Sequence, residues 1–245
     1  MKFFKNILLP MAFWLAVWQL AALIVGKQLL LPGPWAVAVR LGALAVTAGF
    51  WRAAALTLLR VFAGMAIGAV LGVLLAVLTC VSAWCDRLLS PLVKVIRATP
   101  VASFILLVLL WVSSGRVPAV ISALMVLPVI WGSVSKGIRE TDPQLLELAR
   151  AYRFGAWRTL RLVRVPCVLP YFTSAAETAL GLAWKAGVAA EVLCYPKWAV
   201  GSEIYRARLS FETADLFAWT AVVIALSFLV ESALARLLRK AAGHD

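Results

Sequence analysis

Four long stretches of the chain contain no Asp, Glu, Lys or Arg, and each is close to the length of a membrane-spanning helix. They run from Ile7 to Gly26, from Val61 to Trp84, from Ala98 to Gly115 and from Val117 to Ser135. A helix needs about 20 mostly apolar residues to cross the hydrocarbon core of a bilayer. Of the 245 residues, 64% are hydrophobic and only 14% are charged, and the mean hydropathy is +0.95. Because a water-soluble domain cannot cover so much apolar surface, we predict an all-α integral membrane protein.

Two further segments bring the expected number of spans to about six. Leu216 to Val230 is short but extendable, and Pro166 to Tyr195 is apolar except for Glu177, Lys185 and Glu191. A charge at the centre of a bilayer costs a few kcal/mol unless protein or water compensates it. We therefore regard these three charged residues as candidates for lining a translocation path, with a purely structural role as the open alternative. The whole chain, 1–245, is expected to form one transmembrane domain.

The N-terminal part has two features that need separate interpretation. The first apolar stretch follows Lys2 and Lys5, as in a signal peptide, but no cleavage pattern closes it before Lys27, so a retained helix is expected. The segment Leu31-Pro32-Gly33-Pro34 then interrupts any helix. We expect residues 35–50 to form an interfacial helix rather than a span.

The charge distribution predicts the orientation. The chain has 24 Lys and Arg against 11 Asp and Glu, which gives a net charge of +13. Six spans would put both termini on the same side of the membrane as the joins near 82–97 and 136–166. That side would hold 15 of the basic residues, and the other side would hold 8. Cytoplasmic loops are enriched in Lys and Arg, so both termini are predicted to be cytoplasmic and the chain to be a multi-pass protein of the cytoplasmic membrane. The basic residues lie in short gaps between apolar runs, so we expect membrane lipid as a partner and no nucleic acid.

Small residues recur every four positions in two of the spans. This spacing gives one helix face almost no side chains, so that a neighbouring backbone can approach closely. We assign the following residues to helix packing: Gly64, Gly68 and Gly72 in the second span, and Ala183 and Gly187 in the span that carries Glu191. The four cysteines show no spacing typical of metal ligands, so no metal site is expected.

The segment between the fourth span and Pro170 is too polar to cross a membrane but is patterned throughout. Thr141 or Asp142 can cap a helix that begins at Pro143, and Gly155 is expected to end it. A second, basic amphipathic helix is expected to follow and to end at Pro166. A basic amphipathic helix can simply lie on anionic lipid.

The same segment resembles a known motif. Glu147-Leu148-Ala149 is followed by Arg153, nine further residues, Val163, one residue, Val165 and Pro166. This spacing is similar to the EAA motif in the permease subunits of binding-protein-dependent ABC importers: Glu-Ala-Ala, three residues, Gly, nine residues, Ile, one residue, Leu-Pro. The chain departs from it at Leu148 and at Arg153, which stands in place of the glycine, with Gly155 two residues later.

Other segments resemble the nitrate, sulfonate and taurine branch of that family. They are Leu31-Pro32-Gly33-Pro34, Leu58 to Gly64, Arg97-Ala98-Thr99-Pro100, Asp142-Pro143, Gly181 to Lys185 and Ala189-Ala190-Glu191. Their order and spacing carry the resemblance together. It implies a type I, MetI-like bundle and the import of a sulfonate, taurine or nitrate-like anion, or of a heterocycle similar to a thiamine precursor.

The resemblance also implies the partners. The EAA loop, at about 137–166, would form a coupling helix that docks in a groove of a cytoplasmic ATPase, with contacts from the loop residues Glu147, Leu148, Ala149, Arg153, Gly155, Val163 and Pro166. The chain lacks a Walker-type phosphate-binding segment, so two copies of a separate ATPase subunit would bind ATP and Mg²⁺. An external substrate-binding protein and a second, identical permease copy would complete the importer.

Two other functional classes would have different sequence features. A secondary transporter also needs several spans and buried charges, and it remains the alternative, although the chain shows no internal repeat. An intramembrane enzyme would need paired carboxylates, a nucleophile motif or a histidine cluster, whereas the only histidine is His244. We therefore predict no catalytic residues and no enzymatic activity.

Overall fold

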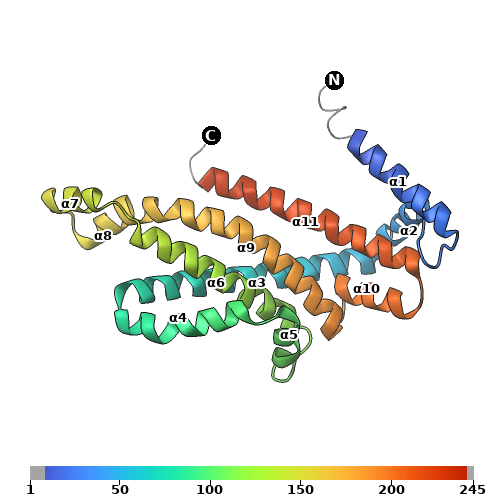
Figure 1. Cartoon of the computed structure of the whole chain (residues 1–245), viewed down its shortest axis with the longest axis horizontal. Helices are drawn as coiled ribbons and strands as arrows, with labels where there is room; N and C mark the ends of the chain where they lie inside the picture. The colour runs from blue at the N-terminus through green and yellow to red at the C-terminus, as the bar shows by residue number, and fades with distance from the viewer. Residues whose placement is uncertain (1–8, 242–245) are drawn as a thin grey trace.

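The computed structural model describes residues 9–241, and this part of the chain is built of helices with no strand (Figure 1). His244 lies outside the described residues. The elements are α1 (Leu9–Val25), α2 (Pro34–Ala45), α3 (Ala48–Val81), α4 (Ala83–Ala98), α5 (Val101–Leu109), α6 (Val117–Arg139), α7 (Pro143–Ala151), α8 (Ala156–Thr159), η2 (Leu160–Arg164), α9 (Val165–Cys194), α10 (Val200–Leu209) and α11 (Thr213–Ala241). The predicted all-α fold is confirmed.

Helices α3, α6 and α9 form the centre of the bundle. Val61 of α3, Val126 and Ile130 of α6 and Leu180 of α9 are at most 2% exposed and belong to one apolar cluster. The Ser122 hydroxyl of α6 donates to a backbone carbonyl of α9, at Ala183, over 3.0 Å. These three helices therefore form the central core of the bundle.

The glycines of α3 allow the close approach of α6. A Cβ at Gly64 would overlap the carbonyl oxygen of Ala119, and one at Gly68 would lie 2.5 Å from that of Ala123. A Cβ at Gly72 would lie 2.9 Å from the Cβ of Ile130. The stripe of small residues thus faces α6, as such stripes do where helix backbones approach closely.

The α9 stripe packs against both α3 and α6. A Cβ at Gly187 would lie 2.7 Å from the Ser122 hydroxyl and from a methyl group of Val61, and Ala183 is fully buried. Ser122 consequently lies where all three helices meet.

Polar contacts at one end of the bundle attach α1 and α2 to α11. Arg40 of α2 forms an ion pair with Asp215 at the start of α11. Trp18 of α1 stacks on Phe217 of α11, with ring centroids 5.8 Å apart, and donates to the carbonyl of Pro32. These contacts order the segment between α1 and α2 against the bundle.

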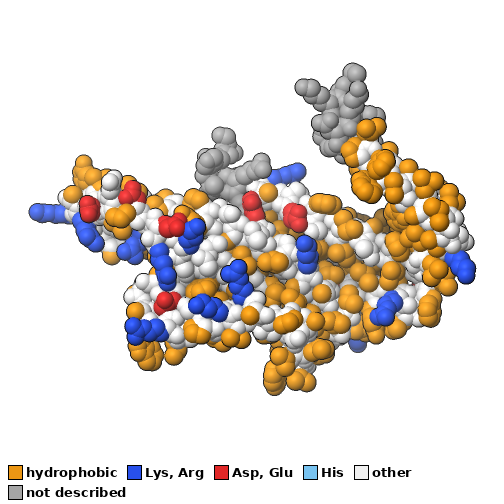
Figure 2. All heavy atoms as spheres, viewed as in Figure 1, with side chains coloured by type: hydrophobic (Ala, Val, Ile, Leu, Met, Phe, Trp, Pro, Cys, Tyr) orange, Lys and Arg blue, Asp and Glu red, His pale blue; other side chains and the backbone are white. Residues whose placement is uncertain are grey.

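The number of membrane spans in the structure agrees only approximately with the six predicted from the sequence. Within residues 9–241, three helices are long and apolar enough to cross a membrane alone, namely α3, α6 and α11, and the bent pair of α4 and α5 makes a fourth. Helix α9 covers the predicted span with its three charged residues, and α1 covers the described part of the first predicted span. Exposed hydrophobic side chains cover much of the flank seen in Figure 2, as expected for a surface in contact with lipid.

The predicted third span, Ala98 to Gly115, is wrong as a single helix. The chain instead forms α4 and α5, which meet at an angle of 105°. Pro100 disfavours helical geometry in the residue before it, and Thr99 is accordingly extended, with φ −77° and ψ 132°. The predicted join near 82–97 forms the amphipathic helix α4, which packs against α3 and α6.

The second span begins earlier than predicted. Helix α3 starts at Ala48, thirteen residues before Val61, and runs for 34 residues. The predicted interfacial helix 35–50 is shortened to α2, because Thr47 has an extended backbone conformation. The Thr47 hydroxyl accepts a hydrogen bond from the backbone N–H of Phe50 and so caps the start of α3. Arg52 and Arg60 thus lie in the N-terminal half of this long helix rather than in a loop.

The close contact of α3 and α6 predicts a large effect for a very small substitution. We expect Gly64→Ala to lower the free energy of unfolding by about 1–3 kcal/mol, because the added methyl group meets backbone that cannot move freely. The matched control is Gly132→Ala in α6, where the new Cβ would meet open space. That control should leave stability unchanged or raise it by up to about 1 kcal/mol through helix propensity. Thermal and denaturant unfolding in detergent would measure both, and equal effects would contradict the packing assignment.

Candidate functional site

The polar segment after α6 projects from one end of the bundle as the helices α7 and α8 (Figure 1). The Asp142 carboxylate accepts from the backbone N–H of Gln144 over 2.8 Å, and Pro143 occupies the first helical position, where its missing N–H is not needed. The predicted start of this helix is therefore confirmed.

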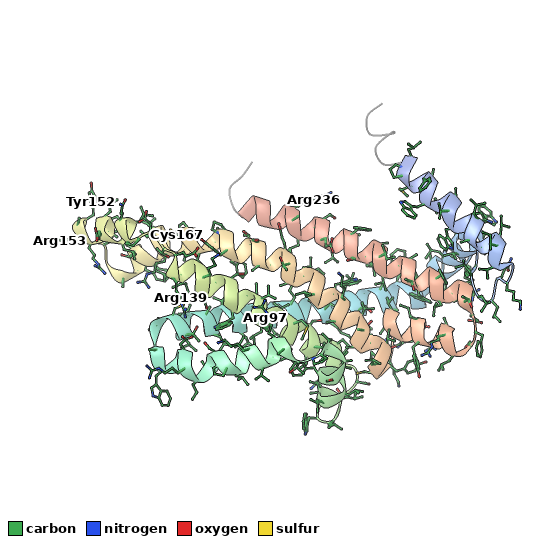
Figure 3. The ribbon with its side chains drawn as sticks, viewed as in Figure 1. Arg97, Arg139, Tyr152, Arg153, Cys167 and Arg236 are labelled. Atoms are coloured by element: carbon green, nitrogen blue, oxygen red, sulfur yellow. The ribbon has the colours of Figure 1, made fainter. Side chains whose placement is uncertain are left out.

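Helix α7 presents an exposed surface that is apolar in part. Leu148 and Tyr152 are 54% and 71% exposed, and Glu147 is exposed beside them, whereas Ala149 is buried on the inner side. An exposed apolar face on a helix at the tip of a molecule marks a contact surface for another protein or for a membrane. Figure 3 shows Tyr152 and Arg153 at this tip.

The turn after α7 differs from the prediction. The helix ends at Ala151, and Arg153 has a positive φ of 52°. The N–H of Phe154 donates to the carbonyl of Ala149 and that of Arg153 to the carbonyl of Arg150, which is the Schellman arrangement. Arg153, rather than Gly155, is thus the left-handed residue that ends the helix.

Gly155 has an extended conformation and precedes α8. The left-handed turn explains why the EAA pattern has glycine where this chain has Arg153, since glycine adopts positive φ without a Cβ penalty. The expectation that Gly155 ends α7 is therefore wrong, because the turn closes two residues earlier.

The second predicted helix does not end at Pro166. The chain remains helical from Ala156 through η2, a π-helical turn, and into α9. The N–H of Val165 donates five residues back, to Leu160, so that Pro166 follows a widened turn and lies in the first turn of α9. Val163 is buried, with 9% exposure, and joins this turn to the bundle.

Glu191 occupies a closed polar network at the opposite end of α9. Its carboxylate accepts from the Thr57 hydroxyl over 2.8 Å, from the Arg60 guanidinium over 3.2 Å and from the backbone N–H of Gly201 over 3.2 Å. Glu191 is fully buried. A buried charge with this many partners is compensated, and in this structure it faces protein rather than an open path.

Arg60 extends this network to the connection between α9 and α10. It donates to the backbone carbonyls of Lys197 and Trp198 over 2.9 and 3.1 Å. Tyr195 and Trp198 in the same connection both have positive φ, near 50°. Arg60 and Glu191 together therefore hold a strained connection against the ends of α3 and α9.

Glu177 and Lys185 are placed differently from Glu191. Both are exposed, and they lie two turns apart along α9 with the half-buried Gly181 between them. Within residues 9–236 no ion pair is formed by either side chain. The structure thus separates the three predicted path residues into one enclosed carboxylate and two charges on an open helix face.

Sequence reasoning did not identify three members of the Glu191 network. Thr57, Arg60 and Gly201 come from α3 and from α10. Arg60 is 131 positions from Glu191, so no local spacing indicates the pair. Its one available signal in the sequence is that it is a basic residue within the apolar pattern of α3, as Arg52 also is.

Comparison with known proteins identifies the family and the fold. Residues 64–243 match the family model described as "Binding-protein-dependent transport system inner membrane component". SsuC of Bacillus subtilis (strain 168), a permease protein named for the transport of aliphatic sulfonates, is 27% identical over 238 residues, which cover 96% of this chain and 86% of the relative. TauC of Escherichia coli (strain K12), named as a taurine transport system permease protein, is 23% identical, covering 91% of this chain and 83% of the relative.

Two solved structures share the architecture. A chain of the MetNI methionine ABC transporter in an inward-facing conformation is 22% identical, with a TM-score of 0.61 over 85% of this chain and 97% of that chain. A chain of a bacterial ABC transporter that imports alginate is 18% identical, with a TM-score of 0.65 over 98% of this chain and 96% of that chain. The predicted MetI-like fold is therefore confirmed.

The Glu191 network yields a stability prediction. We expect Glu191→Ala to lower the free energy of unfolding by about 3–5 kcal/mol, because it removes the fully buried carboxylate that the half-buried guanidinium of Arg60, the Thr57 hydroxyl and the Gly201 N–H share. Combined with Arg60→Ala, the loss should be smaller than the sum of the two single losses. Glu177→Ala on the exposed face of the same helix is the control and should change stability by at most about 0.5 kcal/mol. Additive effects of Glu191→Ala and Arg60→Ala in denaturant titrations would contradict a coupled pair.

Proposed function

Since the chain belongs to the family of binding-protein-dependent transport system inner membrane components, we propose that it is the permease subunit of an ABC importer that translocates a small anion. The match over residues 64–243 is the observation that carries this proposal. This family match favours ATP-driven import over the alternative, a secondary transporter driven by an ion gradient. The ATP would be bound and hydrolysed, with Mg²⁺, by a separate subunit.

The coupling contact is proposed to be α7 with the turn that follows it. The helix is short, projects from the bundle and exposes Leu148 and Tyr152 beside Glu147, which suits docking into a groove of a partner. Ala149 and Val163 are buried and would support this surface rather than contact the ATPase. Arg153 and Gly155 shape the turn, and Pro166 starts α9 directly behind it.

The translocation path is proposed to run along the face of α9 that carries Glu177 and Lys185. Charged side chains inside a span need protein or water around them, and this face is open in the single chain. A second copy of the permease facing it would enclose both residues in an aqueous path between the two chains. We therefore propose a homodimer, with one ATPase subunit for each permease and a substrate-binding protein at the end opposite α7.

The solute is proposed to be a sulfonate, taurine or a similar small anion. The relatives are named for the transport of aliphatic sulfonates, taurine and bicarbonate, which share an anionic group. The positive charge of Lys185 would attract such a group. A heterocycle similar to a thiamine precursor is the second candidate. By the positive-inside rule, the basic residues around α7 and α8 support our proposal that this end is cytoplasmic and that both termini are cytoplasmic too.

Reversing the charge on α7 tests the coupling surface. We expect Glu147→Lys to reduce recovery of the ATPase with the tagged permease, or ATP-driven uptake, by about tenfold, equivalent to about 1.4 kcal/mol of binding. The control, for recovery of the ATPase only, is Glu212→Lys, an exposed acidic residue between α10 and α11. Co-purification in mild detergent with mass spectrometry, and uptake in proteoliposomes, would measure the two effects. Normal recovery and normal uptake in Glu147→Lys would refute the coupling assignment.

Removing the charge of Lys185 tests the path. We expect Lys185→Met to lower the initial rate of anion uptake by about tenfold, since about 1.4 kcal/mol of lost attraction corresponds to that factor. The amount of permease in complex with its ATPase should not change. Lys27→Met, an exposed lysine after α1, is the matched control. Loss of the complex in Lys185→Met would instead make Lys185 a structural residue.

A further inference from the structure

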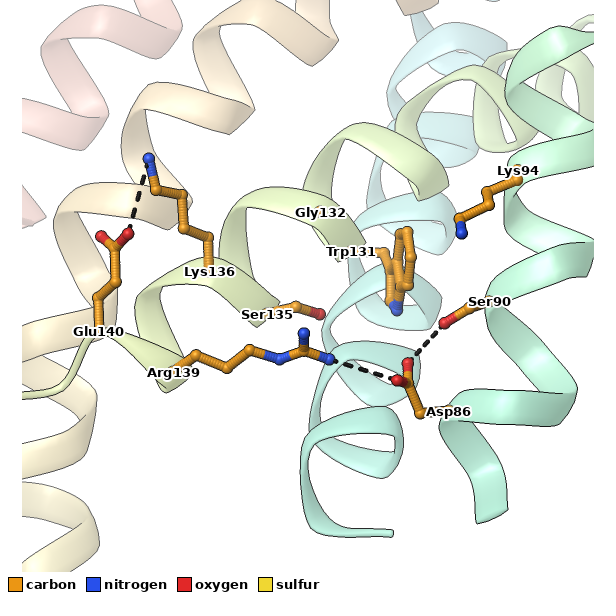
Figure 4. Close-up of a pocket in the computed structure, with 9 residues that line it drawn as sticks. All are labelled: Asp86, Ser90, Lys94, Trp131, Gly132, Ser135, Lys136, Arg139 and Glu140. Carbon is orange, nitrogen blue, oxygen red and sulfur yellow. Dashed lines mark hydrogen bonds and ion pairs between the residues drawn. The ribbon is translucent and has the colours of Figure 1, made fainter. Parts of the chain in front are cut away.

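A polar cavity lies between α4 and α6 (Figure 4), toward the end of the molecule that carries α7 (Figure 1). Its volume is about 500 Å³. Both helices contribute charged side chains to its wall, which are Asp86 and Lys94 from α4, Lys136 and Arg139 from α6, and Glu140 directly after α6. None of these residues belongs to α7 or to the exposed face of α9, so the cavity is separate from the surfaces described above.

The two acidic residues of this cavity already have partners within its wall. Asp86 accepts from the Ser90 hydroxyl over 2.5 Å and lies 3.6 Å from a guanidinium nitrogen of Arg139. Glu140 lies 3.8 Å from the ammonium group of Lys136 and accepts from the Tyr171 hydroxyl over 2.6 Å. Among residues with described side chains, Lys94 has no ion-pair partner. The cavity wall therefore carries one more positive than negative charge, and the exposed Lys94 is its cation without an ion pair.

Ser135 provides a second, independent indication of a ligand. It is 7% exposed, and its hydroxyl is buried without a hydrogen-bond partner within the described residues. Figure 4 shows this hydroxyl directed into the space between Arg139 and Trp131. A buried hydroxyl without a partner costs about 1–3 kcal/mol, so a group that accepts its hydrogen bond is expected in the cavity. A cation and a hydroxyl that both lack an acceptor indicate an anion.

An adjoining cavity connects this location with the proposed path. Its volume is about 630 Å³, and it shares Gly132 and Lys136 with the first cavity while also reaching Arg97. Its far wall includes Thr178 and Leu182 of α9, which are exposed on the helix that carries Glu177 and Lys185. A Cβ at Gly132 would meet no atom within 4 Å, so the boundary between the two cavities is open.

We propose that the α4–α6 cavity binds the oxyanion group of the transported solute on the cytoplasmic side of the permease, as a site from which the solute is released. This rests on the proposed function, because it takes the solute to be a small organic anion such as a sulfonate. Lys94 and Ser135 donate to the anion, Lys136 and Arg139 supply the surrounding positive field, and the apolar tail lies against the Trp131 ring. A lipid phosphate offers the same oxyanion chemistry, so the test separates the two sources.

Binding can be measured directly, without transport. The full chain, together with any ATPase that co-purifies, is placed in phosphatidylcholine nanodiscs without nucleotide. Equilibrium binding of ³⁵S-labelled butanesulfonate is then followed at constant ionic strength. Butyltrimethylammonium, which has a similar tail and the opposite charge, should not compete. A parallel sample in phosphatidylglycerol nanodiscs, analysed by native mass spectrometry, shows whether an anionic lipid is retained in the cavity instead.

Three variants and one control address the cavity itself. Lys94→Gln should weaken butanesulfonate binding by about tenfold through loss of a charge-assisted hydrogen bond. Ser135→Ala should weaken it by about threefold to tenfold, while the ligand-free protein melts at the same or a higher temperature. Gly132→Leu fills open space and should abolish binding without unfolding the helix. Arg87→Gln removes an exposed charge from α4 outside both cavities and should leave binding within about twofold.

The outcomes distinguish this proposal from the proposed function. Weaker binding in the three variants, with normal binding in Arg87→Gln, supports the site. The site is refuted by the absence of binding, by equal loss in Arg87→Gln, or by retention of phosphatidylglycerol with no effect of butanesulfonate. If sulfonate uptake driven by ATP persists while the cavity binds nothing, only the site is wrong. If the cavity binds butanesulfonate but the importer with its binding protein takes up no sulfonate, the solute assignment is wrong instead.

Discussion

The close approach of the α3, α6 and α9 backbones determines the rest of the structure. Gly64, Gly68 and Gly72 remove the side chains that would separate α3 from α6, and Ala183 and Gly187 do the same for α9. Between helices in a bilayer the hydrophobic effect contributes little, so van der Waals contact over this surface and the Ser122 hydrogen bond hold the bundle together. The peripheral helices, the broken α4–α5 pair and the projecting α7 are all placed relative to these three helices.

Much of this arrangement could be predicted from the sequence, because lipid-exposed helices must be long, apolar and internally hydrogen-bonded. The spacing of small residues indicated the packing faces, and Asp142 and Pro143 indicated the start of α7. The prediction failed where a single residue redirects the backbone. An uncharged run gives no sign that Thr99 becomes extended before Pro100, and a glycine at position 155 is a more obvious helix stop than Arg153.

Contacts between distant segments were also beyond sequence reasoning. Glu191 was recognised as a costly charge, but its partners come from α3 and from the start of α10, and hydropathy carries no information about such pairs. Three groups of charges lie in different environments. Glu191 is enclosed and compensated, Glu177 and Lys185 lie on an open helix face, and the α4–α6 cavity keeps an unpaired cation. Only the first can be explained by the single chain alone, which is why the other two require a ligand, water or a second subunit.

The uninterrupted helical path from Ala156 to Cys194 has a mechanical consequence. Its 39 residues form one rod that begins beside α7 and ends at the connection held by Arg60 and Glu191. At about 1.5 Å per residue this rod is about 58 Å long, so a rotation of roughly 5° about its middle moves each end by about 2.5 Å in opposite directions. If the helix turns as a rigid body, a displacement applied at one end reaches the other as a movement of the same size, without a relay of side-chain rearrangements. The widened turn at η2 is the place where such a rod can bend, and it sets how much of an applied displacement is transmitted.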